Sequence, residues 1–166
     1  MARENLLMTL PDDSPTRYGK NPLRGRVLAL DLGAKRVGVA VSDELCITVR
    51  ALEPIQRTSW KQLLRAVINQ IVAFDAQALV IGLPLRMDGD EGDAAMDARR
   101  IAQNFSRSLS IPIYLQDERL TSRAAEEDLR AAGVAVKNLR ARIDGESAAI
   151  ILRDFIAEAQ SSLNTL

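Results

Sequence analysis

The sequence from Val27 to Val41 reads VLALDLGAKRVGVAV, and this stretch decides the fold. Two apolar runs, 27–30 and 37–41, flank a polar turn at 32–36, a pattern that predicts two antiparallel strands. The first strand ends at Asp31. Gly38 lies inside the second strand and indicates that another backbone approaches closely there.

The rest of the chain extends this hairpin into an α/β domain. A third strand is expected from Cys46 to Leu52, which completes an antiparallel meander. Ser59 is a predicted N-cap, followed by an amphipathic helix with apolar residues at helical spacing. The later elements are predicted as a strand at 78–81, a loop at 86–92, a helix around Phe105, a strand at 111–115, a helix from Ser122 to Gly133 and a last helix around Ile151.

This order predicts one mixed five-stranded sheet, three antiparallel strands followed by βαβ crossovers, with helices on both faces. Residues 1–24 are predicted to be an irregular N-terminal arm, because three prolines and a glycine interrupt any period. The domain is expected at 25–160, with a tail at 161–166. No apolar run or leader pattern stands out, so a cytoplasmic chain without membrane contact is expected.

Composition excludes several chemistries. The 166 residues contain no histidine and one cysteine, which removes Ser-His-Asp, Cys-His and histidine–zinc sites. Cys46 is expected to be a buried, inert thiol. Carboxylates then become the natural ligands, and their oxygens suit Mg²⁺ or Mn²⁺. The net charge is zero and aromatic residues make up 4%, so any nucleic-acid contact would rely on phosphates.

Three acidic positions are candidates for a site. Asp31 ends the first strand, Asp117-Glu118 ends the fifth, and Asp144 lies near the start of the last helix. Asp144 shares a helical face with the apolar residues that follow it, so it is expected to face the sheet. Ligands of α/β sheets collect at the carboxyl ends of strands, where these acids could meet. Each also has a simpler interpretation: Asp31 could be a turn residue, Asp117-Glu118 could belong to a surface ion-pair cluster, and Asp144 could be a turn residue or an N-cap.

Two loops are open to more than one interpretation. The turn that holds Lys35 could approach a phosphate or be a plain hairpin turn. The loop 86–92 could move over a site, or its acids could simply favour the start of the next helix.

Four segments together resemble the YqgF/RuvX family. The residues that carry the resemblance are Ala29 to Asp43, Val80 to Gly92, Asp117 to Ser122, and Asp144 with Ala148 to Leu152. The match covers roughly residues 25–160 in the right order and spacing. It implies the ribonuclease-H-like fold of the RuvC resolvases and a nuclease that matures the 5′ end of pre-16S rRNA, with Holliday junction resolution as the alternative.

The resemblance also implies site residues. It places metal-binding catalytic carboxylates at Asp31, Glu118 and Asp144, with two Mg²⁺ or Mn²⁺ ions expected. Candidates for substrate contact are Lys35, Arg36, Arg119 and Thr121. Whether Asp43 or Asp117 supports the site is left open. Nucleic acid is the expected partner, and the chain is expected to be a monomer or a homodimer.

Two other functions fit parts of the pattern. A nucleic-acid-binding domain without catalysis would share the fold, although it would not need all three acids. Actin-like ATPases and sugar kinases also open with an Asp-x-Gly strand-turn-strand, but they need two such domains and this length predicts one.

Overall fold

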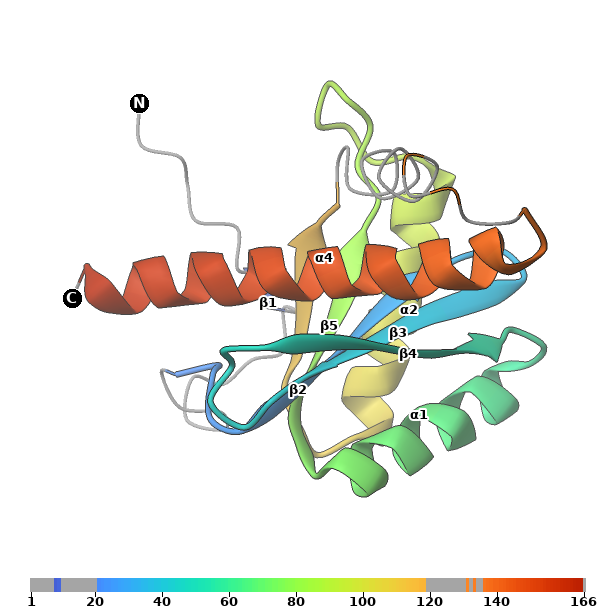
Figure 1. The fold of residues 1–166 in the computed structure, drawn as a ribbon. Helices are drawn as coiled ribbons and strands as arrows, with labels where there is room; N and C mark the ends of the chain where they lie inside the picture. The colour runs from blue at the N-terminus through green and yellow to red at the C-terminus, as the bar shows by residue number, and fades with distance from the viewer. Residues whose placement is uncertain (1–7, 10–20, 119–130, 132, 134–135, 166) are drawn as a thin grey trace.

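The computed structural model describes residues 8–9, 21–118, 131, 133 and 136–165 (Figure 1). Its elements are β1 Met8–Thr9, β2 Arg26–Leu32, β3 Arg36–Ser42, β4 Val49–Gln56, α1 Trp60–Phe74, β5 Ala76–Leu83, α2 Asp93–Ser108, β6 Ile113–Asp117 and α4 Val136–Asn164. The described strands form one sheet in the order β1-β6-β5-β2-β3-β4. Among the described helices, none combines the length and the apolar character that crossing a membrane requires.

The strand pairing matches the prediction. Strands β2, β3 and β4 form the antiparallel meander, and β5 and β6 then add in parallel beside β2. The five predicted strands and their mixed pairing are therefore confirmed. A short sixth strand, β1, lies antiparallel to β6 at the edge of the sheet. It comes from the segment 1–24, for which the sequence predicts no strand.

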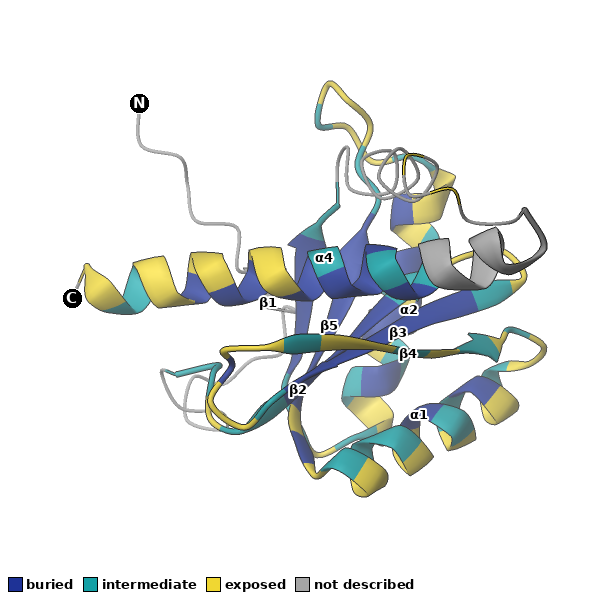
Figure 2. Ribbon diagram, in the orientation of Figure 1, coloured by how far each residue is buried: buried dark blue, intermediate teal, exposed yellow. Residues whose placement is uncertain are grey.

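Helices cover both faces of the sheet, as predicted. Leu28 and Leu30 point to the face covered by α1 and α2, where they join a core that includes Phe105. The alternate residues Val27 and Ala29 point to the opposite face and pack under α4. Figure 2 shows the sheet buried beneath α4, whose outer surface is exposed. Because strand side chains alternate with period two, Asp31 belongs to the α4 face.

The third strand begins later than the sequence predicts. It starts at Val49 rather than Cys46, because Asp43 accepts hydrogen bonds from the backbone N–H groups of Ile47 (2.7 Å) and Thr48 (2.8 Å) and closes a turn. Cys46 itself has a positive φ of 53°, which a regular strand does not allow. Its thiol is buried, as expected, and burial raises its pKa.

The helices differ from the prediction in one important place. Ser59 caps α1 as expected, since its hydroxyl accepts a hydrogen bond from Gln62 N at 3.2 Å. The last helix, however, already begins at Val136, so Asp144 lies within it rather than near its start. The N-cap interpretation of Asp144 is therefore wrong. Most of the predicted helix from Ser122 to Gly133 lies outside the described residues.

Candidate active site

Strand order brings two of the candidate acids to the same edge of the sheet. Asp31 lies near the carboxyl end of β2, and Glu118 follows the last residue of β6. The two strands are separated by β5, which pairs in parallel with both. Parallel strands end at the same edge, which explains why residues so far apart in the chain become neighbours.

Two glycines on the strands beside β2 make room for the acids. On one side, a Cβ atom at Gly82 of β5 would overlap Glu118 Oε2. On the other side, Gly38 of β3 is the register partner of Asp31, and a Cβ there would overlap the backbone oxygen of Asp144. Gly38 thus allows α4 to lie directly on the sheet, as its place in the strand predicted.

Asp31 and Glu118 share a side-chain hydrogen bond. The pKa of Glu118 is raised to about 8, mainly by burial and secondly by the nearby charge of Asp31. Burial also raises the pKa of Asp31 to about 6, although the hydrogen bond from Glu118 opposes this shift. At neutral pH the pair therefore holds one proton, which Glu118 donates to the Asp31 carboxylate.

Asp144 approaches the pair from α4. Its negative charge is one of the causes of the raised pKa of Asp31, so the two carboxyl groups are close enough to interact electrostatically. The Asp144 side chain is also held by Arg36, whose Nε lies 3.0 Å from Asp144 Oδ2. Asp144 is therefore shared between the acidic pair and a cation on the first residue of β3.

The donor set fits a hard divalent cation, although the described residues do not form a ready-made cage. Glu118 Oε2 is buried and has no hydrogen-bond partner among them, which is the condition of an atom that lacks a ligand. Clustered carboxylates of this kind are the oxygen ligands that Mg²⁺ and Mn²⁺ prefer. Within the described part of the chain, however, no three acidic side chains converge closely enough to hold an ion.

Comparison with known proteins now identifies the family. The family model described as "RuvX: Holliday junction resolvase" matches residues 25–158. The chain belongs to the RuvX family. A relative from Anaeromyxobacter dehalogenans, named as a candidate pre-16S rRNA nuclease, is 40% identical over 131 residues, which are 79% of this chain and 96% of that protein. A relative from Syntrophus aciditrophicus with the same name is 38% identical over 79% of this chain and 87% of its own length.

A solved structure agrees with the RuvX fold. Thermus thermophilus RuvC, determined in complex with a Holliday junction substrate, is similar with a TM-score of 0.50 at 14% identity. The likeness covers 80% of this chain and 94% of that chain. The predicted family and the ribonuclease-H-like fold are therefore confirmed, and this RuvX chain is an enzyme that hydrolyses phosphodiester bonds.

The remaining predicted residues of this RuvX chain lie in different places. Lys35 is exposed on the turn between β2 and β3. Arg36 lies beside it but is bound to Asp144. Arg119 and Thr121 fall outside the described residues. Asp117 ends β6 next to Glu118, and its charge helps to raise the pKa of Glu118.

Asp43 takes no part in the site of this RuvX chain. It follows β3 beyond Ser42, at the other end of the strand from Gly38, and its carboxylate is occupied by the backbone of its own turn. Those backbone hydrogen bonds hold the pKa of Asp43 below its usual value. The structure thus makes Asp43 a turn residue.

One contributor was missed by the sequence analysis. Arg57, just after β4, donates from its backbone N–H to Lys35 O (2.9 Å) and from Nη1 to Gly33 O (2.9 Å). Its Nη2 donates to Asp97 Oδ2 on α2 at 2.5 Å. Arg57 therefore ties the turn that carries Lys35 to the helix layer. No motif or periodicity marks this residue in the sequence.

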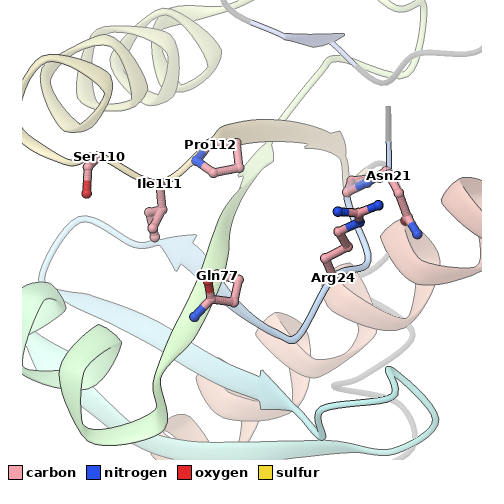
Figure 3. Close-up of a pocket in the computed structure, with 7 residues that line it drawn as sticks. Asn21, Arg24, Gln77, Ser110, Ile111 and Pro112 are labelled. Atoms are coloured by element: carbon pink, nitrogen blue, oxygen red, sulfur yellow. The ribbon is translucent and has the colours of Figure 1, made fainter. Parts of the chain in front are cut away.

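The pocket in Figure 3 is not part of this site. Its volume is about 240 Å³, and its lining includes Arg24, Gln77 and Pro112. These residues lie at or just before the amino ends of β2, β5 and β6. The pocket is therefore at the opposite edge of the sheet from Asp31 and Glu118.

Proposed function

We propose that this RuvX chain is a divalent-metal-dependent endonuclease that cleaves structured nucleic acid, with precursor 16S rRNA as its substrate. The observation that carries the proposal is the half-buried, hydrogen-bonded pair Asp31–Glu118, with the charge of Asp144 beside it. Gathering three half-buried carboxyl groups is unfavourable through desolvation and repulsion, so their accumulation calls for a cationic ligand. Turn residues or surface ion pairs would not need to be buried in this way.

Asp31, Glu118 and Asp144 would hold the metal, which we propose to be two Mg²⁺ or Mn²⁺ ions. When bound, such ions lower the pKa of a water molecule and stabilise negative charge on the phosphate. Asp31 and Glu118 must first give up the proton that they share. Their raised pKa values therefore lower the fraction of molecules that can bind a cation at neutral pH. Burial keeps competing water away from Glu118 Oε2.

Cations beside the acids would position the substrate. Lys35 is exposed on a turn fixed by Arg57, where its ammonium group can contact a backbone phosphate. We propose the same role for Arg119 and Thr121, which follow Glu118 in the sequence. The product would carry a 5′-phosphate and a 3′-hydroxyl group, and a precursor-rRNA substrate would place the enzyme in the cytoplasm.

Precursor rRNA is favoured because the relatives that match most of the chain are named for it. The family description names a second substrate, the Holliday junction. A resolvase must cut two strands, so that function would require a dimer. One preparation should therefore be tested on a precursor-16S fragment and on a four-way junction of similar length.

The decisive assay measures cleavage of both substrates with Mg²⁺, Mn²⁺, Ca²⁺ or EDTA. We expect cleavage of the precursor with Mg²⁺ or Mn²⁺, little with Ca²⁺ and none in EDTA. Glu118→Gln keeps the hydrogen bond to Asp31 but cannot ionise to bind a cation, and it serves as the inactive control. Full activity in EDTA would contradict the metal mechanism. Exclusive cleavage of the junction would show that the substrate is branched DNA rather than rRNA.

A further inference from the structure

The ion pair between Arg36 and Asp144 joins the first residue of β3 to the first half of α4. Arg36 Nε lies 3.0 Å from Asp144 Oδ2, and both side chains are largely buried, with 29% and 27% exposed. The contact follows from the backbone, because Gly38 on the same strand lets α4 approach at Asp144 itself. It is therefore a built feature of the site rather than a chance meeting of two long surface side chains.

This ion pair competes with the role proposed for Asp144. A carboxylate that holds a divalent cation cannot give the same lone pairs to a guanidinium group. Among the described residues, no three acids converge on one point, while Arg36 faces Asp144 Oδ2. Asp144, the proposed third metal ligand, is therefore in contact with Arg36 instead.

The same guanidinium group has a second natural partner. Arginine binds phosphate as well as it binds carboxylate, because its planar fork matches both groups. Arg36 follows directly on the exposed Lys35, so a nucleic-acid backbone that reaches one cation also reaches the neighbourhood of the other. A phosphate that takes Arg36 removes this cation from Asp144, whose charge acts on Asp31 beside Glu118.

We propose that Arg36 is a positioning residue that competes with the metal for Asp144, so that nucleic-acid binding and metal binding strengthen each other. The proposal rests on the proposed function, because it takes the three acids to be the metal ligands. Thermodynamic linkage makes the coupling reciprocal: a phosphate that engages Arg36 raises metal affinity by the factor by which metal raises nucleic-acid affinity. The enzyme then binds its metal more tightly when a substrate is present.

Lys35 offers a matched control. It is the preceding residue on the same turn, it carries the same charge, and it forms no ion pair with the residues that the structure describes. Replacing either cation by Gln removes one positive charge near the acids. Only the replacement of Arg36 removes the direct competitor for Asp144.

The first experiment titrates Mn²⁺ into the full chain without nucleic acid and follows binding by electron paramagnetic resonance. We expect Arg36→Gln to bind Mn²⁺ about three- to tenfold more tightly than the wild type, the range expected for loss of a partly buried ion pair. Lys35→Gln should change the affinity clearly less. Arg36→Lys, which restores the cation, should return the affinity toward the wild-type value and shows that the Gln effect is not a folding defect.

A double-mutant cycle tests whether the effect passes through Asp144. In Asp144→Asn, Arg36 no longer faces a charged carboxylate, so adding Arg36→Gln should change Mn²⁺ affinity little. An equal gain in the presence and absence of the Asp144 carboxylate would overturn the proposal. So would equal gains for Arg36→Gln and Lys35→Gln, because general electrostatics would then explain both.

The second experiment measures binding of a fluorescent precursor-rRNA hairpin in EDTA and in Ca²⁺, which is expected not to support cleavage. The ratio of the two affinities should exceed one in the wild type and be smaller in Arg36→Gln. An unchanged ratio would overturn the coupling. This failure differs from failure of the proposed function, which would appear as cleavage in EDTA or as full activity of Glu118→Gln.

Discussion

Gly82 lies directly beneath the carboxyl group of Glu118, on the strand that separates β2 from β6. A Cβ atom at position 82 would overlap Glu118 Oε2 and would lie 2.7 Å from Ile151 Cδ1 of α4. Any side chain there would displace the carboxyl group of Glu118, which is hydrogen-bonded to Asp31. The position of the Glu118 carboxyl group thus depends on a glycine, which has no side chain that could take part in the reaction.

Gly82→Ala is expected to impair cleavage more than it impairs folding. Both atoms that the new methyl group would meet are side-chain ends, so they can move at a cost of about 1–3 kcal/mol in the free energy of unfolding. Displacement of Glu118 by about an ångström should lower kcat by about 10–100-fold. Cleavage rates and melting temperature of the same preparation check both expectations.

Gly38→Ala provides the comparison for that variant. Its new methyl group would meet the backbone oxygen of Asp144 rather than a flexible side chain, so α4 itself would have to shift. The melting temperature should therefore fall further than in Gly82→Ala. Wild-type cleavage and stability in Gly82→Ala would show that the close contact with Glu118 has no functional consequence.

The sequence was sufficient to predict that Asp31 and Glu118 could lie close together, but not the details of their contact. The strand pattern and the rule that ligands collect at carboxyl ends placed Asp31 and Glu118 at one edge. Helical periodicity placed Asp144 on the correct face of the last helix, yet it misplaced the start of that helix. Periodicity identifies a face and contains no information about the terminus unless a capping residue is present.

Other features of the site depend on contacts between distant segments, and local sequence patterns do not encode these. The ion pair of Arg36 with Asp144 forms only because Gly38 allows the helix to approach. The bridging role of Arg57 requires knowledge of where α2 lies relative to the β2–β3 turn. Strand β1 has two residues, which is too short for any period to be recognised.

Arg57→Ala is expected to weaken substrate binding while leaving the chemical step nearly intact. The Arg57 side chain joins Gly33 O to Asp97 Oδ2, so its loss frees the turn that presents Lys35. We expect KM for the nucleic acid to rise several-fold with kcat within about twofold of the wild type, and a stability loss of about 1 kcal/mol. Steady-state kinetics at two salt concentrations provide the measurement.

Asp97→Asn separates the two contacts of Arg57. It weakens the ion pair on α2, but it retains the hydrogen bond to Gly33 O and the backbone hydrogen bond to Lys35 O. Its KM should therefore lie between those of the wild type and Arg57→Ala. A loss of kcat without a change of KM in Arg57→Ala would show that Arg57 does not act through the turn.

Asp31→Asn is expected to abolish cleavage and to leave the fold intact. Asn retains the shape and can still accept the hydrogen bond from Glu118, but it lacks the charge that holds a divalent cation. Metal stabilisation of the transition state contributes several kcal/mol, and each ~1.4 kcal/mol is a factor of ten, so the rate should fall by several orders of magnitude. A turn role predicts the opposite, a destabilised but active protein, and measuring the melting temperature and the cleavage rate of one preparation distinguishes the two.

The acidic pair should also make the stability of the metal-free protein depend on pH in an unusual direction. The carboxyl groups of Asp31 and Glu118 ordinarily titrate at 3.8 and 4.5, but in the folded chain their pKa values are raised to about 6 and about 8. Between these values the folded state binds more protons than the unfolded state. The free energy of unfolding should therefore fall as pH rises from 5 to 8, by up to a few kcal/mol.

The other groups with shifted pKa values do not oppose this fall in stability between pH 5 and 8. The pKa values of Asp43, Glu91 and Asp97 are lowered, so their contributions to stability are lost as the pH falls through their ordinary values of 3.8 and 4.5 to the lowered ones. Asp154 has a raised pKa, mainly through burial, so its contribution to the pH dependence of stability has the same sign. The measurement is urea unfolding in EDTA at several pH values from 5 to 8.

Glu118→Gln and added Mg²⁺ should each change that pH profile in a defined way. Gln cannot ionise, so the variant should lose most of the fall in stability between pH 5 and 8. Mg²⁺ binds the deprotonated carboxylates of the folded state, so saturating metal should stabilise the wild type most at pH 8 and flatten or reverse the slope. The Gln variant should gain little from Mg²⁺ at either pH. A wild-type stability that rises from pH 5 to 8 in EDTA would mean that Glu118 is already ionised in the folded protein. It would contradict the conclusion that Glu118 and Asp31 share a proton.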